Sequence, residues 1–254
     1  MTPDPIPLRS PSTLECRNCG AGAPVDEHFC PQCSRILALG RHGDYFSFLG
    51  LPRKLVIDSN DLERRFRDLS RKFHPDYFYN ASPTERLASL ERSSYLNDAY
   101  RTLRAMPTRV EHLLAIEGMP PVKSEDPSTG SGQGGAAKVP AGLLEEVFEL
   151  NEELDEIRES RESGGVPGQL ATRLQKAREP IDAKREAHEQ QLEALAARWD
   201  AQADGAPPEE RRAILEALRE RLLERNYINN LLATIEREVA SLGIGNQDSG
   251  IGRG

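Results

Sequence analysis

Residues 61–76 read Asp-Leu-Glu-Arg-Arg-Phe-Arg-Asp-Leu-Ser-Arg-Lys-Phe-His-Pro-Asp, and this run predicts a helix with two unlike faces. Its apolar residues recur at spacings of four, three and four: Leu62, Phe66, Leu69 and Phe73. At about 100° per residue these side chains form one stripe that can pack against a core. Because the residue before a proline is pushed out of the α region, the helix should end before Pro75. The sequence thus predicts an exposed loop, His74-Pro75-Asp76, at the end of this helix.

The side of this helix opposite the apolar stripe is basic. We expect four of its side chains to face outward and meet a partner protein: Arg64, Arg67, Arg71 and Lys72. Two further helical runs flank the segment, a short one over residues 44–50 and the end of a longer one over residues 96–103. On the residues alone, an ordinary helical hairpin whose arginines form a solvated face remains an alternative.

The arrangement resembles a J-domain, the module that activates heat-shock ATPases of the DnaK and HscA class. The run Asp-Tyr-Phe-Ser-Phe-Leu-Gly over residues 44–50 is similar to its short first helix, and Leu-Asn-Asp-Ala-Tyr-Arg-Thr-Leu over residues 96–103 closes its third. The resemblance implies a J-domain over residues 44–118. It also implies that His74, Pro75 and Asp76 trigger ATP hydrolysis by the partner.

Charge and hydropathy narrow the classes of partner. The net charge of −8 is uneven, because residues 119–254 hold twenty-six acids and seventeen bases whereas residues 1–43 are balanced. Phosphate binding needs clustered Lys and Arg, so we expect no nucleic-acid partner. No apolar run approaches the length that spans a bilayer, and the first fifteen residues resemble neither a secretory signal nor a transit peptide. We therefore expect a cytoplasmic protein with no membrane partner.

Composition divides the chain into segments. Helical periodicity predicts three C-terminal helices near residues 141–162, 168–203 and 208–242, and Pro180 should kink or break the second near Glu179. The expected fold is all-α, a J-domain hairpin plus a three-helix bundle, preceded by a small metal knuckle. We expect these segments: disorder in 1–15, a tetracysteine domain in 16–40, the J-domain in 44–118, a Gly/Ser/Pro linker in 119–140, the bundle in 141–243 and a tail in 244–254.

The four cysteines form two C-x-x-C pairs separated by ten residues: Cys16, Cys19, Cys30 and Cys33. Two such pairs make two knuckles whose thiolates can converge on one structural Zn²⁺ ion. Disulfides are disfavoured in a cytoplasmic chain, a redox dithiol lacks a surrounding βαβ pattern, and iron is not excluded by the ligand type. Four sulfurs complete the shell, so we expect His28 and His42 to be bystanders.

The first bundle helix carries a second feature beside its predicted core stripe, which consists of Leu143, Val147, Leu150, Leu154 and Ile157. Leu144 and Phe148 lie to one side of that stripe and continue by fours into Glu152 and Glu156, with Glu149 nearby. One interpretation is a solvated acidic face with Phe148 widening the core. The other is a docking surface with an apolar anchor and an acidic rim, suited to a basic partner.

The run Glu-Leu-Asn-Glu-Glu-Leu-Asp-Glu-Ile over residues 149–157, following a J-domain, resembles the HscB family of co-chaperones for iron–sulfur cluster assembly. The tetracysteine segment is similar to that of the eukaryotic branch. The resemblance implies a bundle that binds a cluster scaffold protein of the IscU type through these residues: Leu144, Phe148, Glu149, Glu152, Glu156 and Tyr227. Glu145 departs from the apolar residue of bacterial relatives, and Tyr227 replaces a phenylalanine.

The function that the resemblance implies is a co-chaperone without catalysis of its own. It would capture a scaffold protein with its bundle and deliver it to an HscA/DnaK-class ATPase through its J-domain, with a structural zinc ion in front. Two alternatives stay open: a general J-protein for unfolded clients, and a zinc-ribbon nucleic-acid-binding protein. An enzyme is not expected, because no nucleophile–base pair or open metal site is evident.

Overall fold

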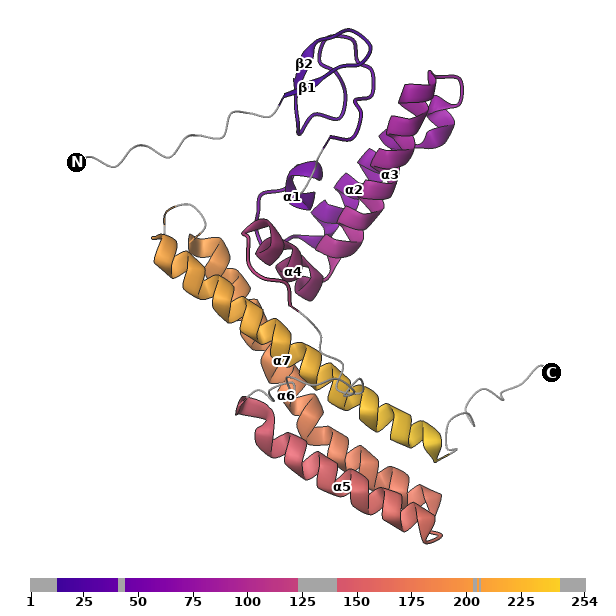
Figure 1. The fold of residues 1–254 in the computed structure, drawn as a ribbon, viewed down its shortest axis with the longest axis vertical. Helices are drawn as coiled ribbons and strands as arrows, with labels where there is room; N and C mark the ends of the chain where they lie inside the picture. Colours follow the sequence, from indigo (N-terminus) through magenta and orange to yellow (C-terminus); the bar gives the residue numbers. More distant parts are fainter. Residues whose placement is uncertain (1–12, 41–43, 123–140, 203–204, 206, 243–254) are drawn as a thin grey trace, which may run out of the picture. The chain divides into compact units, whose positions relative to one another are not determined.

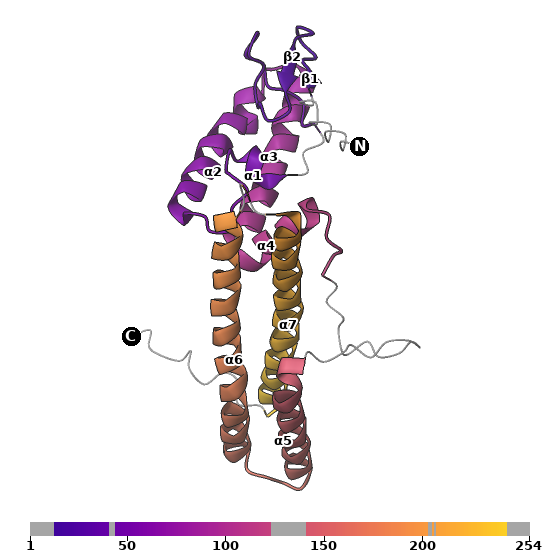
Figure 2. The same ribbon diagram turned by 90° about the vertical axis from the view of Figure 1, so that its left-hand side faces the viewer.

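A computed structural model describes residues 13–40, 44–122, 141–202, 205 and 207–242. Its contacts divide the chain into two compact units. We call residues 1–120, with residues 199–203, the N-terminal unit, and the remainder the bundle unit. Apart from one two-stranded sheet, the regular structure of the described residues is helical (Figures 1 and 2), which confirms the predicted all-α fold with a small knuckle in front.

The N-terminal unit begins with the knuckle segment, residues 13–40. Strands β1 (Thr13–Glu15) and β2 (Gly22–Pro24) pair antiparallel there, with Thr13 opposite Pro24. The expectation of disorder through residue 15 is therefore wrong for Thr13–Glu15, because backbone pairing with β2 orders this strand. Residues 1–12 lie outside the described residues, as do residues 41–43, which include His42.

The helices of this unit follow from local signals. The Asp44 carboxylate caps α1 (Tyr45–Phe48), and the Asp58 carboxylate caps α2 (Ser59–Phe73). Ser82 and Glu85 form a reciprocal capping box at the start of α3 (Pro83–Arg104). The segment also holds the 3₁₀ turn η1 (Pro75–Phe78) and a further helix that the sequence analysis did not single out, α4 (Met106–Ile116).

Helices α2 and α3 lie side by side and form the hairpin of the N-terminal unit (Figure 1). The ends of the predicted stripe, Leu62 and Phe73, are buried, whereas Phe66 and Leu69 are half-buried at the edge of the core. Ile36 of the knuckle segment belongs to the same apolar cluster. The knuckle segment and the hairpin thus share a core, although the sequence suggested separate domains.

The bundle unit holds η3 (Ala141–Leu143), α5 (Leu144–Glu162), α7 (Pro208–Ser241) and, up to residue 198, α6 (Pro167–Gln202). Figure 2 shows α6 and α7 running side by side, with α5 against the N-terminal part of α6. Buried residues of the α5 stripe meet Leu174 of α6 and Ile228 of α7 in one core: Leu143, Val147, Leu150, Leu154 and Ile157. All three helices match their predicted bounds to within one to three residues.

Pro180 lies inside α6 without ending it, so the alternative of a broken helix is wrong. Proline removes one hydrogen bond from the ladder, but the buried neighbour Ile181 holds this turn in the bundle core. Among the helices of the described residues, none combines the length and the apolar character that crossing a membrane requires. The linker residues 123–140 and the tail from residue 243 lie outside the described residues.

Candidate functional site

The His74-Pro75-Asp76 loop stands at the exposed end of α2, as predicted. The imidazole of His74 caps η1, because its Nδ1 accepts a hydrogen bond from the backbone N–H of Asp76 at 3.3 Å. Pro75 occupies the first position of η1, where its missing N–H costs nothing. Nδ1 also lies 3.5 Å from a carboxylate oxygen of Asp76. With Nδ1 engaged inside the loop, Nε2 is the ring nitrogen left to face a partner.

The arginines on the outer face of α2 are exposed but already paired along the helix. Arg67 donates to Glu63 at 2.6 Å, Arg71 donates to Asp68 at 2.5 Å, and Arg64 pairs with Asp61. Lys72 is exposed at the end of the same helix. All four predicted basic residues therefore lie on one helix next to the loop, but three carry a carboxylate neighbour that the sequence analysis did not consider.

Arg65, which flanks this face, has a different role. Its guanidinium donates to the backbone carbonyls of Leu49 and Gly50 and to the carboxylate of Asp61. These contacts tie the end of α1 to α2. Arg65 therefore stabilises the hairpin and is not part of a free basic surface.

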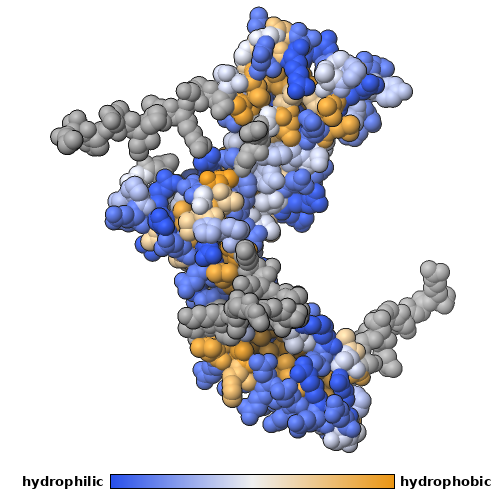
Figure 3. Space-filling view, viewed as in Figure 1, coloured by the Kyte–Doolittle hydropathy of each residue, from blue (hydrophilic) through white to orange (hydrophobic). Residues whose placement is uncertain are grey.

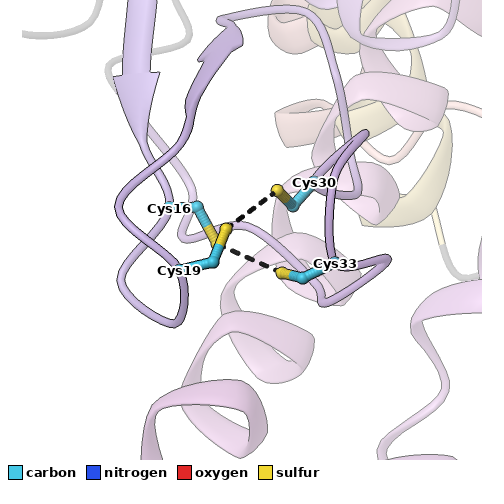
Figure 4. Close-up of side chains that lie close together, drawn as sticks. All are labelled: Cys16, Cys19, Cys30 and Cys33. Carbon is cyan, nitrogen blue, oxygen red and sulfur yellow. Dashed lines mark hydrogen bonds between the residues drawn. The ribbon is translucent and has the colours of Figure 1, made fainter.

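The four cysteines converge at the tip of the knuckle segment (Figure 4). The sulfur of Cys16 lies 3.6 Å from that of Cys33, and the sulfur of Cys19 lies 3.7 Å from that of Cys30. All four sulfurs lie within 4.8 Å of one another, and none forms a disulfide. Four sulfurs at about 2.3 Å from a tetrahedral ion stand about 3.8 Å apart. The donor set therefore fits one metal ion in a closed shell.

The two knuckles repeat one backbone pattern. The N–H of Gly20 donates to the carbonyl of Cys16, and the N–H of Ser34 donates to the carbonyl of Cys30, both at 2.8 Å. The residue after each C-x-x-C pair has a positive φ, +72° at Gly20 and +57° at Ser34. A left-handed residue is easy for glycine and strained for serine. The same turn therefore positions the sulfurs in both knuckles, and its backbone is strained only at Ser34.

The thiols are unequally prepared to ionise. A backbone hydrogen bond at Arg35, followed by hydrogen bonds from Asn18 and neighbouring cysteines, lowers the pKa of Cys33 to about 6. At Cys19 a backbone hydrogen bond at Ala21 favours the thiolate, but burial and the other sulfurs together raise the pKa to about 12. One thiolate is therefore ready for a cation, and further ligands ionise as the metal binds and releases protons.

The predicted surface on α5 has exposed apolar side chains. Leu144 is 54% exposed and Phe148 is 72% exposed, whereas the neighbouring stripe residue Leu143 is 3% exposed. Figure 3 shows apolar surface near the N-terminal end of α5. Glu149 and Glu152 are exposed on the same helix. Phe148 therefore does not widen the core, and we call Leu144, Phe148, Glu149 and Glu152 the α5 surface.

Two predicted members of this surface are placed differently. Glu156 is exposed, but its carboxylate accepts a hydrogen bond from Arg173 of α6 at 2.6 Å. Tyr227 of α7 is partly buried against the bundle core, and burial raises the pKa of its phenol. Tyr227 thus packs partly against the core, whereas Leu144 and Phe148 are exposed.

The other histidines among the described residues, His28, His112 and His188, have structural partners. The Nε2 atom of His112 accepts from the backbone N–H of Tyr45 at 3.0 Å, and that of His188 lies 2.6 Å from the carbonyl of Arg221. His28 is not among the grouped metal ligands, as expected, but its Nδ1 lies 2.7 Å from Nη1 of Arg92. Arg92 is buried in the N-terminal unit. The sequence did not indicate this, because an arginine on a charged helix is normally expected to face solvent.

The His74-Pro75-Asp76 loop follows a basic helix that packs against α3, and this arrangement resembles a J-domain. No family model matches the sequence. The structure is similar to that of the human co-chaperone protein HscB, with 25% identity and a TM-score of 0.63 over 89% of this chain and 98% of the human chain.

A second similar structure is the chaperone HscB from Vibrio cholerae. It is 24% identical, with a TM-score of 0.52 over 78% of this chain and 99% of the other, and bears on the fold. Together with the clustered cysteines, these similarities confirm the resemblance to the HscB family that residues 149–157 predicted.

Proposed function

We propose that this protein is a J-type co-chaperone of iron–sulfur cluster assembly. Its bundle unit binds a scaffold protein of the IscU type, and its J-domain engages a heat-shock ATPase of the HscA/DnaK class and stimulates ATP hydrolysis. The observation that carries the proposal is the exposed pair Leu144 and Phe148 with acidic neighbours, on a chain that also carries an exposed His74-Pro75-Asp76 loop.

The α5 surface supports a specific partner over diverse unfolded clients. Phe148 is 72% exposed beside Leu144, which is 54% exposed, and an apolar patch that polar residues surround is typical of a protein–protein interaction site. The exposed carboxylates of Glu149 and Glu152 limit the apolar area and favour a basic rim on the partner. A groove for many unfolded chains would need a broader apolar area than one leucine and one phenylalanine.

The trigger side of the proposal uses the J-domain. We assign ATPase binding to Arg64, Arg67, Arg71 and Lys72, and the stimulation of hydrolysis to His74, Pro75 and Asp76. The protein acts as an effector and performs no catalysis of its own. We also propose that the metal ion held by the four cysteines is structural zinc, since tetrahedral sulfur ligation in a closed shell suits it, and that the protein works in the cytoplasm.

Scaffold binding is tested by calorimetric titration of the full-length protein with an IscU-type scaffold. We expect binding at micromolar strength that Phe148→Ala weakens by about thirtyfold, the effect of losing an aromatic anchor of about 2 kcal/mol. Val166→Ala is the matched control, because Val166 is 58% exposed but lies between α5 and α6, outside the α5 surface. A wild-type protein that does not bind the scaffold contradicts the proposal and favours general client delivery.

ATPase stimulation is tested by single-turnover hydrolysis with a DnaK-class partner. We expect His74→Gln to abolish stimulation without changing the melting temperature, since the side chain is exposed and outside the core. Arg71→Ala should weaken stimulation several-fold. The control is Arg101→Ala on α3. Arg101 is as exposed as Arg71 and, like it, pairs with an aspartate three residues earlier, Asp98 at 2.7 Å, but it lies on another helix. Full stimulation by His74→Gln rejects the assignment.

A further inference from the structure

Arg92 of α3 is a cation that the N-terminal unit buries completely, with 0% of its surface exposed. Burial lowers the pKa of its guanidinium to about 10, so the group still carries its charge at neutral pH. A buried charge is tolerated only where hydrogen-bond acceptors replace the lost water. The source of those acceptors therefore shows what Arg92 depends on.

The acceptors come from the knuckle segment. The Nε atom of Arg92 donates to the carbonyl of Leu37 at 2.8 Å, and Nη2 donates to the carbonyls of Glu27 at 3.3 Å and Ala38 at 3.2 Å. Nη1 lies 2.7 Å from Nδ1 of His28, and since a guanidinium only donates, Nδ1 is the acceptor. A helix of the J-domain thus buries a cation whose hydrogen bonds go to another segment.

His28 occupies a second key position. Its ring packs edge-on against Phe48 at 4.8 Å and against Phe73 at 5.0 Å between ring centroids. The guanidinium of Arg92 lies over the same two rings, 6.0 Å and 5.8 Å from their centroids. His28 and Arg92 therefore enclose Phe73 from the side of the knuckle segment.

Phe73 is the last residue of α2 and directly precedes His74. Its ring is fully buried, and its carbonyl accepts hydrogen bonds from the hydroxyls of Ser89 at 2.6 Å and Ser93 at 3.0 Å. The residue before the His74-Pro75-Asp76 loop is thus held in two ways: α3 binds the carbonyl of Phe73, and His28 and Arg92 pack against its ring.

We propose that Arg92 and His28 form a clasp through which the folded knuckle segment holds Phe73, and with it the His74-Pro75-Asp76 loop, in position. Both are positioning residues, since they act through Phe73. His28 stands two residues before Cys30 and Leu37 stands four residues after Cys33, so a metal that folds the knuckles would also set the acceptors of the clasp. A second tie, Arg35 to Glu85 at 2.9 Å, joins the knuckle segment to the start of α3.

The test is amide hydrogen exchange of the full-length, metal-bound protein, followed by NMR at Tyr77 and Tyr79, whose N–H groups donate to His74 and Asp76 within the loop. We expect Arg92→Lys to speed their exchange by about tenfold, because an ammonium cannot reproduce the fork of charge-assisted hydrogen bonds. The control is Arg109→Lys, since Arg109 is also a buried arginine of this unit but donates to Leu103 and Arg104 at the far end of α3.

Metal removal gives the second arm. A chelator should speed exchange at Tyr77 and Tyr79 in the wild-type protein about as much as Arg92→Lys does. It should add little in the Arg92→Lys variant, because metal removal and the substitution both break the clasp between the knuckle segment and Phe73. Unchanged exchange in Arg92→Lys, equal effects from Arg109→Lys, or chelator and variant effects that multiply as independent changes would each overturn the clasp.

The inference deepens the proposed function but is measured without it. Exchange needs no ATPase and no scaffold, so a clasp that passes this test stands even if the wild-type protein stimulates no ATPase. Where stimulation is present, we expect Arg92→Lys and His28→Ala to lower it several-fold while scaffold binding by the α5 surface stays unchanged. If these variants stimulate the ATPase at the wild-type level although the loop amides exchange faster, then the mobility of the loop does not govern stimulation, and the positioning role is overturned.

Discussion

The N-terminal unit and the bundle unit are held together by different means. The bundle has repeating apolar stripes on long helices, and its ion pairs between helices, such as Arg158 with Glu238 at 2.6 Å, lie at the partly exposed edge. The N-terminal unit instead buries Ser89, Arg92 and Arg109 and uses four sulfurs. Buried polar groups fix one arrangement but fail together when one partner is lost, whereas an apolar stripe loses stability in small steps.

Metal removal should separate the two units most strongly. Structural zinc contributes about 10 kcal/mol or more of apparent binding free energy to small metal-folded domains, which the knuckle segment would lose. We expect a chelator to release one zinc per chain and to shift only the calorimetric transition of the N-terminal unit. A protein prepared under reducing, zinc-replete conditions that contains no metal would contradict both the site and this difference.

Truncating one bundle leucine should have the next largest effect, on the other unit. Leu154 is 2% exposed in the bundle core, so Leu154→Ala should lower the free energy of unfolding by about 3 kcal/mol. The control Leu144→Ala, on the same helix but 54% exposed, should change it little. Urea unfolding of the bundle transition measures both, and equal losses would show that α5 is not packed as described.

Relieving strain in the knuckle should give a smaller gain. Ser34 has φ of +57°, so Ser34→Gly should stabilise the N-terminal unit by about 1 kcal/mol. The same change at Ser163, which ends α5 with φ of −84°, relieves no strain and should not stabilise the bundle. Thermal unfolding of the metal-bound protein compares them. A loss of stability in Ser34→Gly would show that its side chain matters more than its backbone.

Mild acid should have the smallest effect on the bundle. Burial lowers the pKa of His188; the carbonyl of Arg221 opposes this shift, the charges of Arg221 and Arg225 add to it, and Glu189 opposes it. Below the ordinary value of 6.5 the unfolded chain then binds more protons, so stability is complete above that pH and falls as the pH decreases. The measurement is the melting temperature of the bundle at pH 7 and pH 5, in the wild-type protein and in His188→Gln. If the variant loses as much stability at pH 5 as the wild type does, the loss comes from a group other than His188.

Sequence periodicity was sufficient for the bundle. The stripe from Leu143 to Ile157 predicted both the helix and its buried face, whereas the offset of Leu144 and Phe148 left two interpretations open, and their exposed side chains favour the docking surface. The limit was Pro180, where tertiary packing carried the helix through a residue that local propensity disfavours.

The N-terminal unit was less predictable. The spacing of the cysteines gave the metal site, and the apolar stripe gave α2. However, the contact of Arg92 with His28 joins residues sixty-four apart in sequence, and no local pattern marks it. The ion pairs of the α2 arginines could have been predicted from the sequence, because Asp61, Glu63 and Asp68 stand three or four residues before them.

That pairing changes what binding at α2 involves. Under the proposed function, a partner carboxylate meets arginines that Glu63 and Asp68 already partly neutralise, and it either exchanges with those carboxylates or binds the other N–H groups of the guanidinium. Such an exchange releases few small ions, and its dependence on salt is weaker than the number of arginines suggests. The exchange also favours a carboxylate that is placed for bidentate hydrogen bonds over an anion that offers charge alone. Under the proposed function, the helix would therefore select its partner by geometry more than by charge alone.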